Sequence, residues 1–287
     1  MDDMEVLILN NLKKIGYELY DRVKPLNLSH QKAVLKEYGK LHAVSFALRD
    51  QHPDQFRTLI NSKDFMRGFF ALKGIQKSVQ KAVNEAMDIF REKGDFTLAE
   101  KLERIFYKNP GELALDLFRM DKDNPEAVIL HGDCWNNNFM YKYENHDRLS
   151  PSKVMILDWQ LSAIRSPVFD LSYFIYATAS SEGVEQFDEL MELGSDPEKL
   201  FPFSALRTHW RKYALYGLIF TIFILKFGLC EKEDAPELAD LAEDDDMGDF
   251  LNVTLKNKDL YYERLRPAIS TRLRRHFEGE IWQKKSL

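Results

Sequence analysis

The spacing of apolar and polar residues along the chain predicts a mainly helical protein. From Ser29 onward, apolar residues recur every three or four positions, which is typical of an amphipathic helix, and the Ser29 side chain can cap its first turn. The same spacing predicts further helices at about 54–61, 71–92, 96–106, 111–119, 169–178, 204–229 and 259–278. The acidic stretch 231–246 is interpreted as a solvated loop. We therefore expect helices to supply most of the core.

Short apolar runs with strand character interrupt this helical pattern. Residues 5–9 form such a run ahead of Asn10 and Asn11, which predicts a strand followed by a turn. Residues 127–130 and 154–157 form two more, and each ends in a polar cluster. We expect the ends of these two strands to be adjacent, in a small hairpin-like insert within one helical domain. The predicted fold class is α+β, mainly helical.

Composition and charge narrow the classes of partner and compartment. A hydrophobic share of 45% with 30% charged residues is typical of a folded globular protein. The net charge of -6 provides no general attraction for nucleic acid or anionic lipid, so neither is expected as a partner. Cys134 and Cys230 lack metal-ligand spacing and no signal-peptide pattern precedes them, which favours a cytoplasmic protein. The most apolar run, 213–229, is interrupted by Lys226 and is shorter than the roughly 20 residues of a membrane span, so it predicts a buried helix.

The chemistry-bearing residues follow the two predicted strands. After the first strand, His131 and Asp133 are followed by Asn138 in the spacing H-x-D-x-x-x-x-N, and Asp158 ends the second strand. Phosphoryl transfer needs a carboxylate that accepts the proton of the attacking hydroxyl, and oxygen ligands that hold Mg²⁺ against the phosphates. Asp133 can serve as the base, with Asn138 and Asp158 as metal ligands. Each motif alone would be an ordinary polar turn, but their order and spacing favour a kinase-type site.

Three longer segments carry a family resemblance. They are residues 131–140 (HGDCWNNNFM), 156–162 (ILDWQLS) and 166–174 (SPVFDLSYF). Together they resemble the ecdysteroid kinase-like family, whose relatives include the aminoglycoside phosphotransferases and the choline/ethanolamine kinases. The resemblance implies the C-terminal lobe of a protein-kinase-like fold, ATP and Mg²⁺ as cofactors, and a small-molecule alcohol as substrate. The expected acceptor is a hydroxyl group of a lipophilic molecule such as an ecdysteroid.

The resemblance also assigns roles to individual residues. It makes Asp133 the catalytic base, and Asn138 and Asp158 the metal ligands. It makes Asp170 a structural carboxylate that braces the catalytic loop, and it places His131 beneath that loop. A structural role for the His131 imidazole is favoured over proton transfer because Asp133 already supplies the base.

The same resemblance suggests how the chain is divided. Residues 1–14 correspond to the last strand and hinge of an N-terminal lobe, with Leu9, Asn10 and Asn11 at the nucleotide, and residues 15–287 to the C-terminal lobe. The match is strongest within 1–180. None of the 13 glycines forms a G-x-G pair, so the phosphate loop of an N-terminal lobe is missing from this sequence. We expect residues 1–287 alone to be a poor catalyst.

Several functions therefore stay open. They are a phosphotransferase that is incomplete in this sequence, a catalytically inactive kinase-like binding or regulatory protein, and a kinase of the choline/ethanolamine type. A helical scaffold for apolar ligands ranks last. The presence of Asp133, Asp158 and Asn138 favours the phosphotransferase, because clustered carboxylates repel one another without a cation. Trp135 is interpreted as a core residue, Cys134 receives no chemistry, and no feature of the sequence indicates an oligomeric state.

Overall fold

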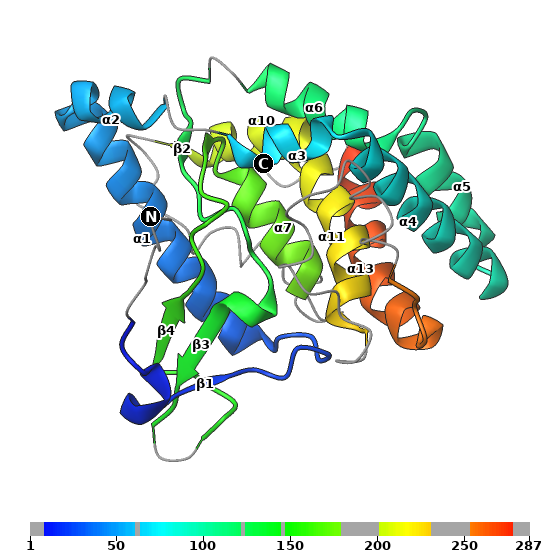
Figure 1. Cartoon of the computed structure of the whole chain (residues 1–287), viewed down its shortest axis with the longest axis horizontal. Coiled ribbons are helices and arrows are strands. Elements are labelled where there is room, and N and C mark those ends of the chain that lie inside the picture. Colours follow the sequence, from blue (N-terminus) through cyan, green and yellow to red (C-terminus); the bar gives the residue numbers. More distant parts are fainter. Residues whose placement is uncertain are drawn as a thin grey trace, which may run out of the picture.

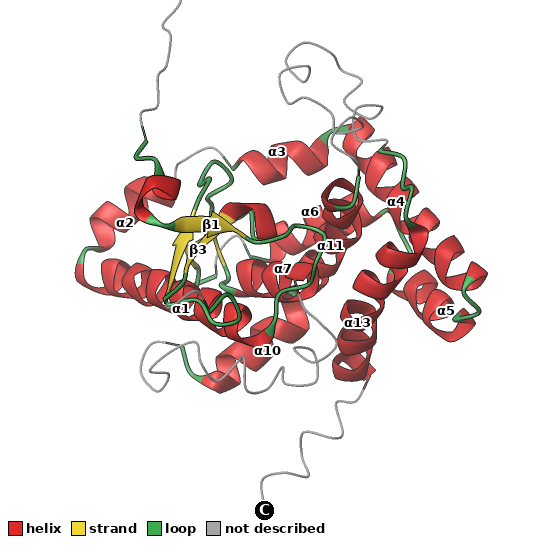
Figure 2. Ribbon diagram, turned by 90° about the horizontal axis from the view of Figure 1, so that it is seen from below, coloured by secondary structure: helices red, strands yellow, loops and turns green. Residues whose placement is uncertain are grey.

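The computed structural model describes residues 9–60, 64–121, 124–144, 147–178, 201–230 and 253–277. Helices form most of it, and a small sheet lies at one end beside α1 (Figures 1 and 2). The helices are α1 (Leu28–Gln51), α2 (Pro53–Ile60), α3 (Phe65–Ala71), α4 (Lys73–Glu92), α5 (Phe96–Ile105), α6 (Pro110–Met120), α7 (Val168–Thr178), α10 (Phe203–Tyr213), α11 (Leu215–Gly228) and α13 (Lys258–Phe277). The α+β, mainly helical class predicted from the sequence is confirmed.

Most helices agree with the predicted segments apart from their ends, but the segment predicted at 204–229 is divided at Ala214 into the two helices α10 and α11. α1 begins at Leu28 because the Asn27 side chain accepts a hydrogen bond from the His30 amide, so Asn27 and not Ser29 is its cap. The predicted helix from residue 71 is preceded by a separate helix, α3, which the sequence analysis did not identify. The extended backbone of Leu72 divides α3 from α4. The predicted acidic loop at 231–246 lies outside the described residues.

The centre of the core is the packing of α7 against α11, two helices that lie side by side in Figures 1 and 2. Their backbones approach closely at Gly217, where a Cβ atom would lie 2.4 Å from the carbonyl carbon of Ser172. The one charged residue of α11, Lys226, is buried and pairs with Glu85 of α4 at 2.6 Å. The apolar run at 213–229 is therefore a buried core helix, as predicted. Among the described residues, no helix is long and apolar enough to cross a membrane.

The strands form two small antiparallel sheets that differ from the predicted insert. β1 (Tyr17–Leu19), β3 (Phe139–Lys142) and β4 (Lys153–Ile156) form one sheet in the order β1-β3-β4. β2 (Val128–Ile129) pairs with β5 (Ile164–Arg165) in the other. The prediction that 127–130 and 154–157 are neighbouring strands was wrong, because β2 pairs with the two-residue strand β5 and β4 pairs with β3, which directly follows the loop after β2. The predicted strand at 5–9 falls outside the described residues except for Leu9, which lies in a loop.

Pairing of β3 with β4 nevertheless produces the expected convergence. Phe139 lies opposite Ile156, so Asn138 and Leu157 extend the ladder by one step on either strand. The Leu157 amide donates a hydrogen bond to the Asn138 carbonyl at 2.9 Å. Asp158 therefore follows directly after the residue that is bonded to Asn138.

Candidate active site

Within the loop between β2 and β3, the side chain of Asn138 fixes the position of Asp133 through hydrogen bonds. The Asn138 amide nitrogen donates to the Asp133 carboxylate oxygen Oδ2 at 2.8 Å and to the Asp133 carbonyl at 3.0 Å. Residues 136–138 form a short 3-10 turn, η2, that brings the two side chains together. Because the amide nitrogen is the atom bonded to Asp133, the amide oxygen of Asn138 is the atom that can ligate a metal.

A second hydrogen bond to Asp133 comes from a residue that the sequence analysis missed. The hydroxyl of Tyr173, a buried residue of α7, donates to the other carboxylate oxygen, Oδ1, at 3.3 Å. Burial raises the pKa of Asp133 above its usual value, while these hydrogen bonds from Asn138 and Tyr173 act in the opposite direction. The nearby charge of Asp158 contributes to the increase. Tyr173 lies three residues after Asp170 on α7, and this helical spacing is the signal that could have identified it.

Asp170 fixes the backbone at the start of the loop. Its carboxylate is 1% exposed and accepts hydrogen bonds from the backbone amides of His131 and Gly132, both at 2.9 Å. It also accepts from His42 Nε2 of α1 at 3.2 Å and from the Cys134 thiol at 3.2 Å. Burial alone would raise the pKa of Asp170, but the His42 contact and the backbone hydrogen bond from His131 hold that pKa below its usual value. The carboxylate lies in the first turn of α7, where a helix favours negative charge.

Gly132 and His131 connect this loop to the chain after β4. Gly132 has a φ of 90°, and a Cβ atom there would lie 2.1 Å from the Leu161 carbonyl oxygen, so the position requires glycine. His131 Nε2 lies 2.7 Å from the Leu157 carbonyl, and its Nδ1 lies 3.1 Å from the Tyr38 hydroxyl. Because a carbonyl only accepts, Nε2 carries the proton and Nδ1 accepts from Tyr38. The imidazole therefore tethers the residue just before Asp158.

Asp158 is placed differently from the other two carboxylates. It is exposed, its φ of 61° lies in the left-handed region, and its carboxylate accepts a hydrogen bond from Gln160 Nε2 at 3.3 Å. Among the described residues it is the one non-glycine position with a positive φ. Such a backbone costs free energy and is enriched at functional sites. The site thus brings Asp133, Asn138 and Asp158 together, with Asp170 and His131 behind the loop.

Leu9, Asn10 and Asn11 precede the 3-10 turn η1 (Leu12–Ile15) and β1 in the chain. Within the described ranges, no hydrogen bond joins them to Asp133, Asn138 or Asp158. The three residues before η1 are exposed. The Asn11 side chain caps η1 by accepting from the Lys14 amide at 3.3 Å. The chain then enters β1, where Leu19 lies opposite Met140 of β3.

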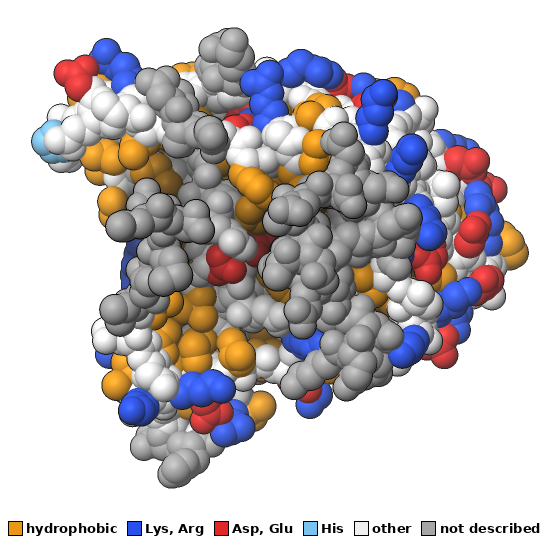
Figure 3. All heavy atoms as spheres, viewed as in Figure 1, with side chains coloured by type: hydrophobic (Ala, Val, Ile, Leu, Met, Phe, Trp, Pro, Cys, Tyr) orange, Lys and Arg blue, Asp and Glu red, His pale blue; other side chains and the backbone are white. Residues whose placement is uncertain are grey.

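Two further residues of the loop have the structural character that the sequence suggested. Trp135 is partly buried and packs against the hydrophobic core. Cys134 is buried, and burial raises the pKa of its thiol well above the usual value, so it does not favour a nucleophilic thiolate. Figure 3 shows acidic side chains on the face seen in Figure 1, with hydrophobic side chains gathered beside them over the small sheet.

The donor set at the site fits Mg²⁺. This ion prefers oxygen ligands, keeps several waters, and binds kinases through one or two side chains together with substrate phosphates. Asp158 offers an exposed carboxylate and Asn138 an amide oxygen. The described residues contain no group of three or more His, Cys, Asp or Glu side chains that could hold a metal, so Mg²⁺ at Asn138 and Asp158 would take its other ligands from water or substrate phosphates.

Comparison with known proteins agrees with this geometry. The ecdysteroid kinase-like family matches residues 1–193, more than half of the 287 residues, and this range includes all three motifs that carried the resemblance. No curated protein matches the chain. The helical architecture with short antiparallel strands is consistent with the predicted C-terminal lobe of a kinase-like fold. The chain belongs to the ecdysteroid kinase-like family.

Proposed function

We propose that this chain supplies the catalytic lobe of an ATP-dependent kinase that phosphorylates a hydroxyl group of a small, lipophilic molecule such as an ecdysteroid. The observation that carries the proposal is the carboxylate of Asp133, which Asn138 and Tyr173 orient from opposite sides. Asp158 lies close enough for its charge to raise the pKa of Asp133. The family match supports a small-molecule kinase.

In the proposed reaction, the oxygen of the acceptor hydroxyl bonds to the γ-phosphorus of ATP while the bond between that phosphorus and the ADP oxygen breaks. Asp133 accepts the proton that the hydroxyl loses. The raised pKa makes this carboxylate a better proton acceptor than an exposed one, as long as it is ionised. Asn138 and Asp158 would hold Mg²⁺, which neutralises charge on the phosphates when bound. Tyr173 and Asn138 keep the Asp133 carboxylate from rotating away from the acceptor.

The nucleotide requires a second part of the site. We propose that residues 1–14 form the last strand and hinge of an N-terminal lobe, with Leu9, Asn10 and Asn11 facing the adenine, and that residues 15–287 form the C-terminal lobe. In kinases the other lobe covers the phosphates and supplies a lysine. Residues 1–287 alone should therefore bind Mg-ATP weakly, because cationic groups contribute much of the affinity for the phosphates.

A lipophilic acceptor fits the surroundings of the site. Trp159, directly after Asp158, is 44% exposed, and its ring packs edge-on against His131 with centroids 5.0 Å apart. An aromatic surface of this kind favours a flat apolar molecule over a strongly hydrated one.

Both cysteines are free thiols, which supports a reducing compartment, and we propose the cytoplasm.

The test is ATP-dependent phosphorylation of ecdysteroid and other alcohols by the chain joined to an N-terminal lobe from another family member. Asp133→Asn should lower turnover by about 10²–10⁴-fold with Mg-nucleotide binding largely intact, because only the proton acceptor is lost. Asp158→Asn should weaken Mg-dependent nucleotide binding and turnover together.

Two outcomes would contradict these assignments. Loss of nucleotide binding in Asp133→Asn with normal binding in Asp158→Asn would reverse the roles of the two carboxylates. A well-folded two-lobed protein that binds Mg-ATP but phosphorylates no alcohol would favour the non-catalytic binding protein instead.

A further inference from the structure

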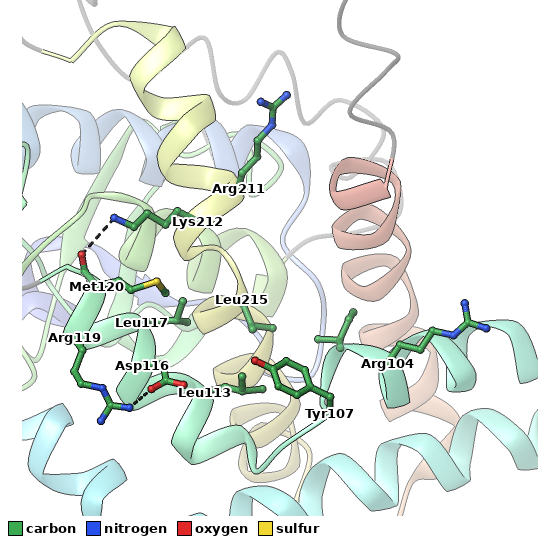
Figure 4. Close-up of a pocket in the computed structure, with 11 residues that line it drawn as sticks. Arg104, Tyr107, Leu113, Asp116, Leu117, Arg119, Met120, Arg211, Lys212 and Leu215 are labelled. Atoms are coloured by element: carbon green, nitrogen blue, oxygen red, sulfur yellow. Dashed lines mark hydrogen bonds and ion pairs between the residues drawn. The ribbon is translucent and has the colours of Figure 1, made fainter.

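A pocket lies away from the candidate active site. It has a volume of about 570 Å³ and is formed where the end of α5 and the loop after it face α6, α10 and α11 (Figure 4). None of its lining residues belongs to the group around Asp133 and Asp158. The volume falls within the range of roughly 300–1,000 Å³ that is usual for small-molecule sites.

The floor of this pocket is apolar. Leu113 and Leu117 come from α6 and Leu215 from the start of α11, and in Figure 4 the Tyr107 ring lies beside Leu113 and Leu215. Tyr107 is 76% exposed and Met120 is 48% exposed. In the part of the chain that the structure describes, these side chains thus present apolar surface to solvent inside a concave site, where a ligand could cover it.

The rim of the pocket is positively charged. Four lining residues are cationic, namely Arg104, Arg119, Arg211 and Lys212, and one is acidic, Asp116. Asp116 already pairs with both Arg119 and Lys108, so it does not neutralise the rest. Within the described ranges, neither Arg104 nor Arg211 has an ion pair with a carboxylate. This concentration of positive charge contrasts with the net charge of -6 of the whole chain.

We propose that this pocket binds a lipophilic anion, with the apolar body on the floor and a carboxylate or phosphate group at the rim. Figure 4 shows the Arg104 and Arg211 side chains at two separate edges of the pocket, extended away from the apolar floor, so their positive charge lies on the solvent side of the pocket. Lys212 donates to the Met120 carbonyl at 3.3 Å and adds positive charge above the floor. A neutral lipid would leave these cations without a counter-charge, and a small polar anion would leave the floor uncovered.

The proposal is tested by calorimetric titration of the full chain with three probes: dodecanoate and dodecyl phosphate below their micellar concentrations, and dodecanol below its solubility limit. Binding of at least one anion is expected, with dodecanol weaker by about tenfold or more, since its hydroxyl cannot form the charge-assisted hydrogen bonds that an anionic head group forms with arginine. The affinity for the anion should fall as salt rises. The binding of one anion without the other would support the site and identify its head group. Absence of binding by both anions, or equal affinity for dodecanol, would overturn it.

Variants locate the binding. Arg104→Glu with Arg211→Glu should reduce anion affinity by about tenfold or more through lost contacts and repulsion. The control pair is Arg57→Glu with Arg67→Glu, which makes the same charge change at exposed positions that do not line the pocket. Tyr107→Ser should lower the affinity of the pocket for all three probes, because it removes apolar surface from the floor. Circular dichroism establishes that each variant is folded. Equal losses in both arginine pairs would mean that bulk charge and not this pocket attracts the anion, and would overturn the proposal.

Discussion

Asp170 and Asp158 are both carboxylates of the candidate active site, but the fold treats them in opposite ways. Asp170 is buried and accepts hydrogen bonds from His131, Gly132, His42 and Cys134. Asp158 is exposed, has a left-handed backbone and accepts a hydrogen bond from Gln160 at 3.3 Å. The first carboxylate is satisfied by the protein itself, while the second keeps oxygen atoms open to solvent. This difference separates a residue that builds the site from one that can bind a ligand.

Asp133 lies between these extremes. It is half-buried, two of its hydrogen bonds come from side chains of the protein, and its pKa is raised by burial. A carboxylate in this state is oriented yet retains a tendency to take up a proton, which suits a base. The site is thus rigid behind the loop and open at the end of β4. The same substitution should therefore have very different effects on stability at Asp170, behind the loop, and at Asp158, after β4.

The largest difference is expected between Asp170→Asn and Asp158→Asn. Asp170→Asn should lower the free energy of unfolding by roughly 3–5 kcal/mol. It breaks the buried pair with His42, and it places an amide nitrogen, which is a donor, against the backbone amides that donate to Asp170. Asp158→Asn should change it by less than about 0.5 kcal/mol, as for most exposed positions. Urea unfolding measures both. Similar losses in the two variants would contradict the contrast.

The Asp170 effect should also depend on pH. The folded-state pKa of Asp170 is depressed, so its contribution to stability is present above the pKa of the unfolded chain and is lost as the pH falls through the folded-state pKa. The gap in unfolding free energy between the original chain and Asp170→Asn should therefore shrink as the solution is acidified into that range. A gap that grows on acidification would mean that Asp170 is not held in its ionised form.

The sequence predicted the helices because their apolar spacing is a local property. It also predicted which residues meet at the site, since the five-residue step from Asp133 to Asn138 is short enough for one turn to close. It did not predict the strand pairing, because β5 has only two residues and the partner of each strand is chosen by register across loops. Asn138 and Asp158 nevertheless lie near each other, because the Leu157 amide donates a hydrogen bond to the Asn138 carbonyl.

The support of the loop was only partly predictable. Asp170 was assigned from the resemblance, but its partner His42 lies 128 residues away on α1. Tyr38 and Tyr173 likewise reach the loop from helices whose faces are fixed only when the core packs. An aromatic residue at helical spacing indicates a core position and does not specify where its hydroxyl points. Such contacts depend on tertiary packing and leave no signal in a short stretch of sequence.

A smaller effect is expected from the backbone of Asp158. Asp158→Gly should be more stable than Asp158→Ala by about 1 kcal/mol, because a Cβ atom penalises the left-handed region and glycine has none. Both variants lose the carboxylate, so the comparison separates backbone conformation from charge. Thermal and urea unfolding measure the difference. Equal stability would indicate that residue 158 does not keep a positive φ in solution.

An effect of similar size is expected from Tyr173→Phe, which removes one of the two hydrogen bonds to the Asp133 side chain and about 1 kcal/mol of stability. Because that hydrogen bond stabilises the carboxylate, its loss should raise the pKa of Asp133 further above the usual value. A base must be ionised to accept a proton, so the acid limb of kcat in the two-lobed protein should move to higher pH. Carboxyl ¹³C NMR titration of the chain alone reports the same pKa without requiring turnover.

Tyr176→Phe is the matched control, because Tyr176 is also buried on α7 and its hydroxyl is not bonded to Asp133. A shift of the Asp133 titration in both variants, or in neither, would show that Tyr173 packs beside the carboxylate without controlling its proton.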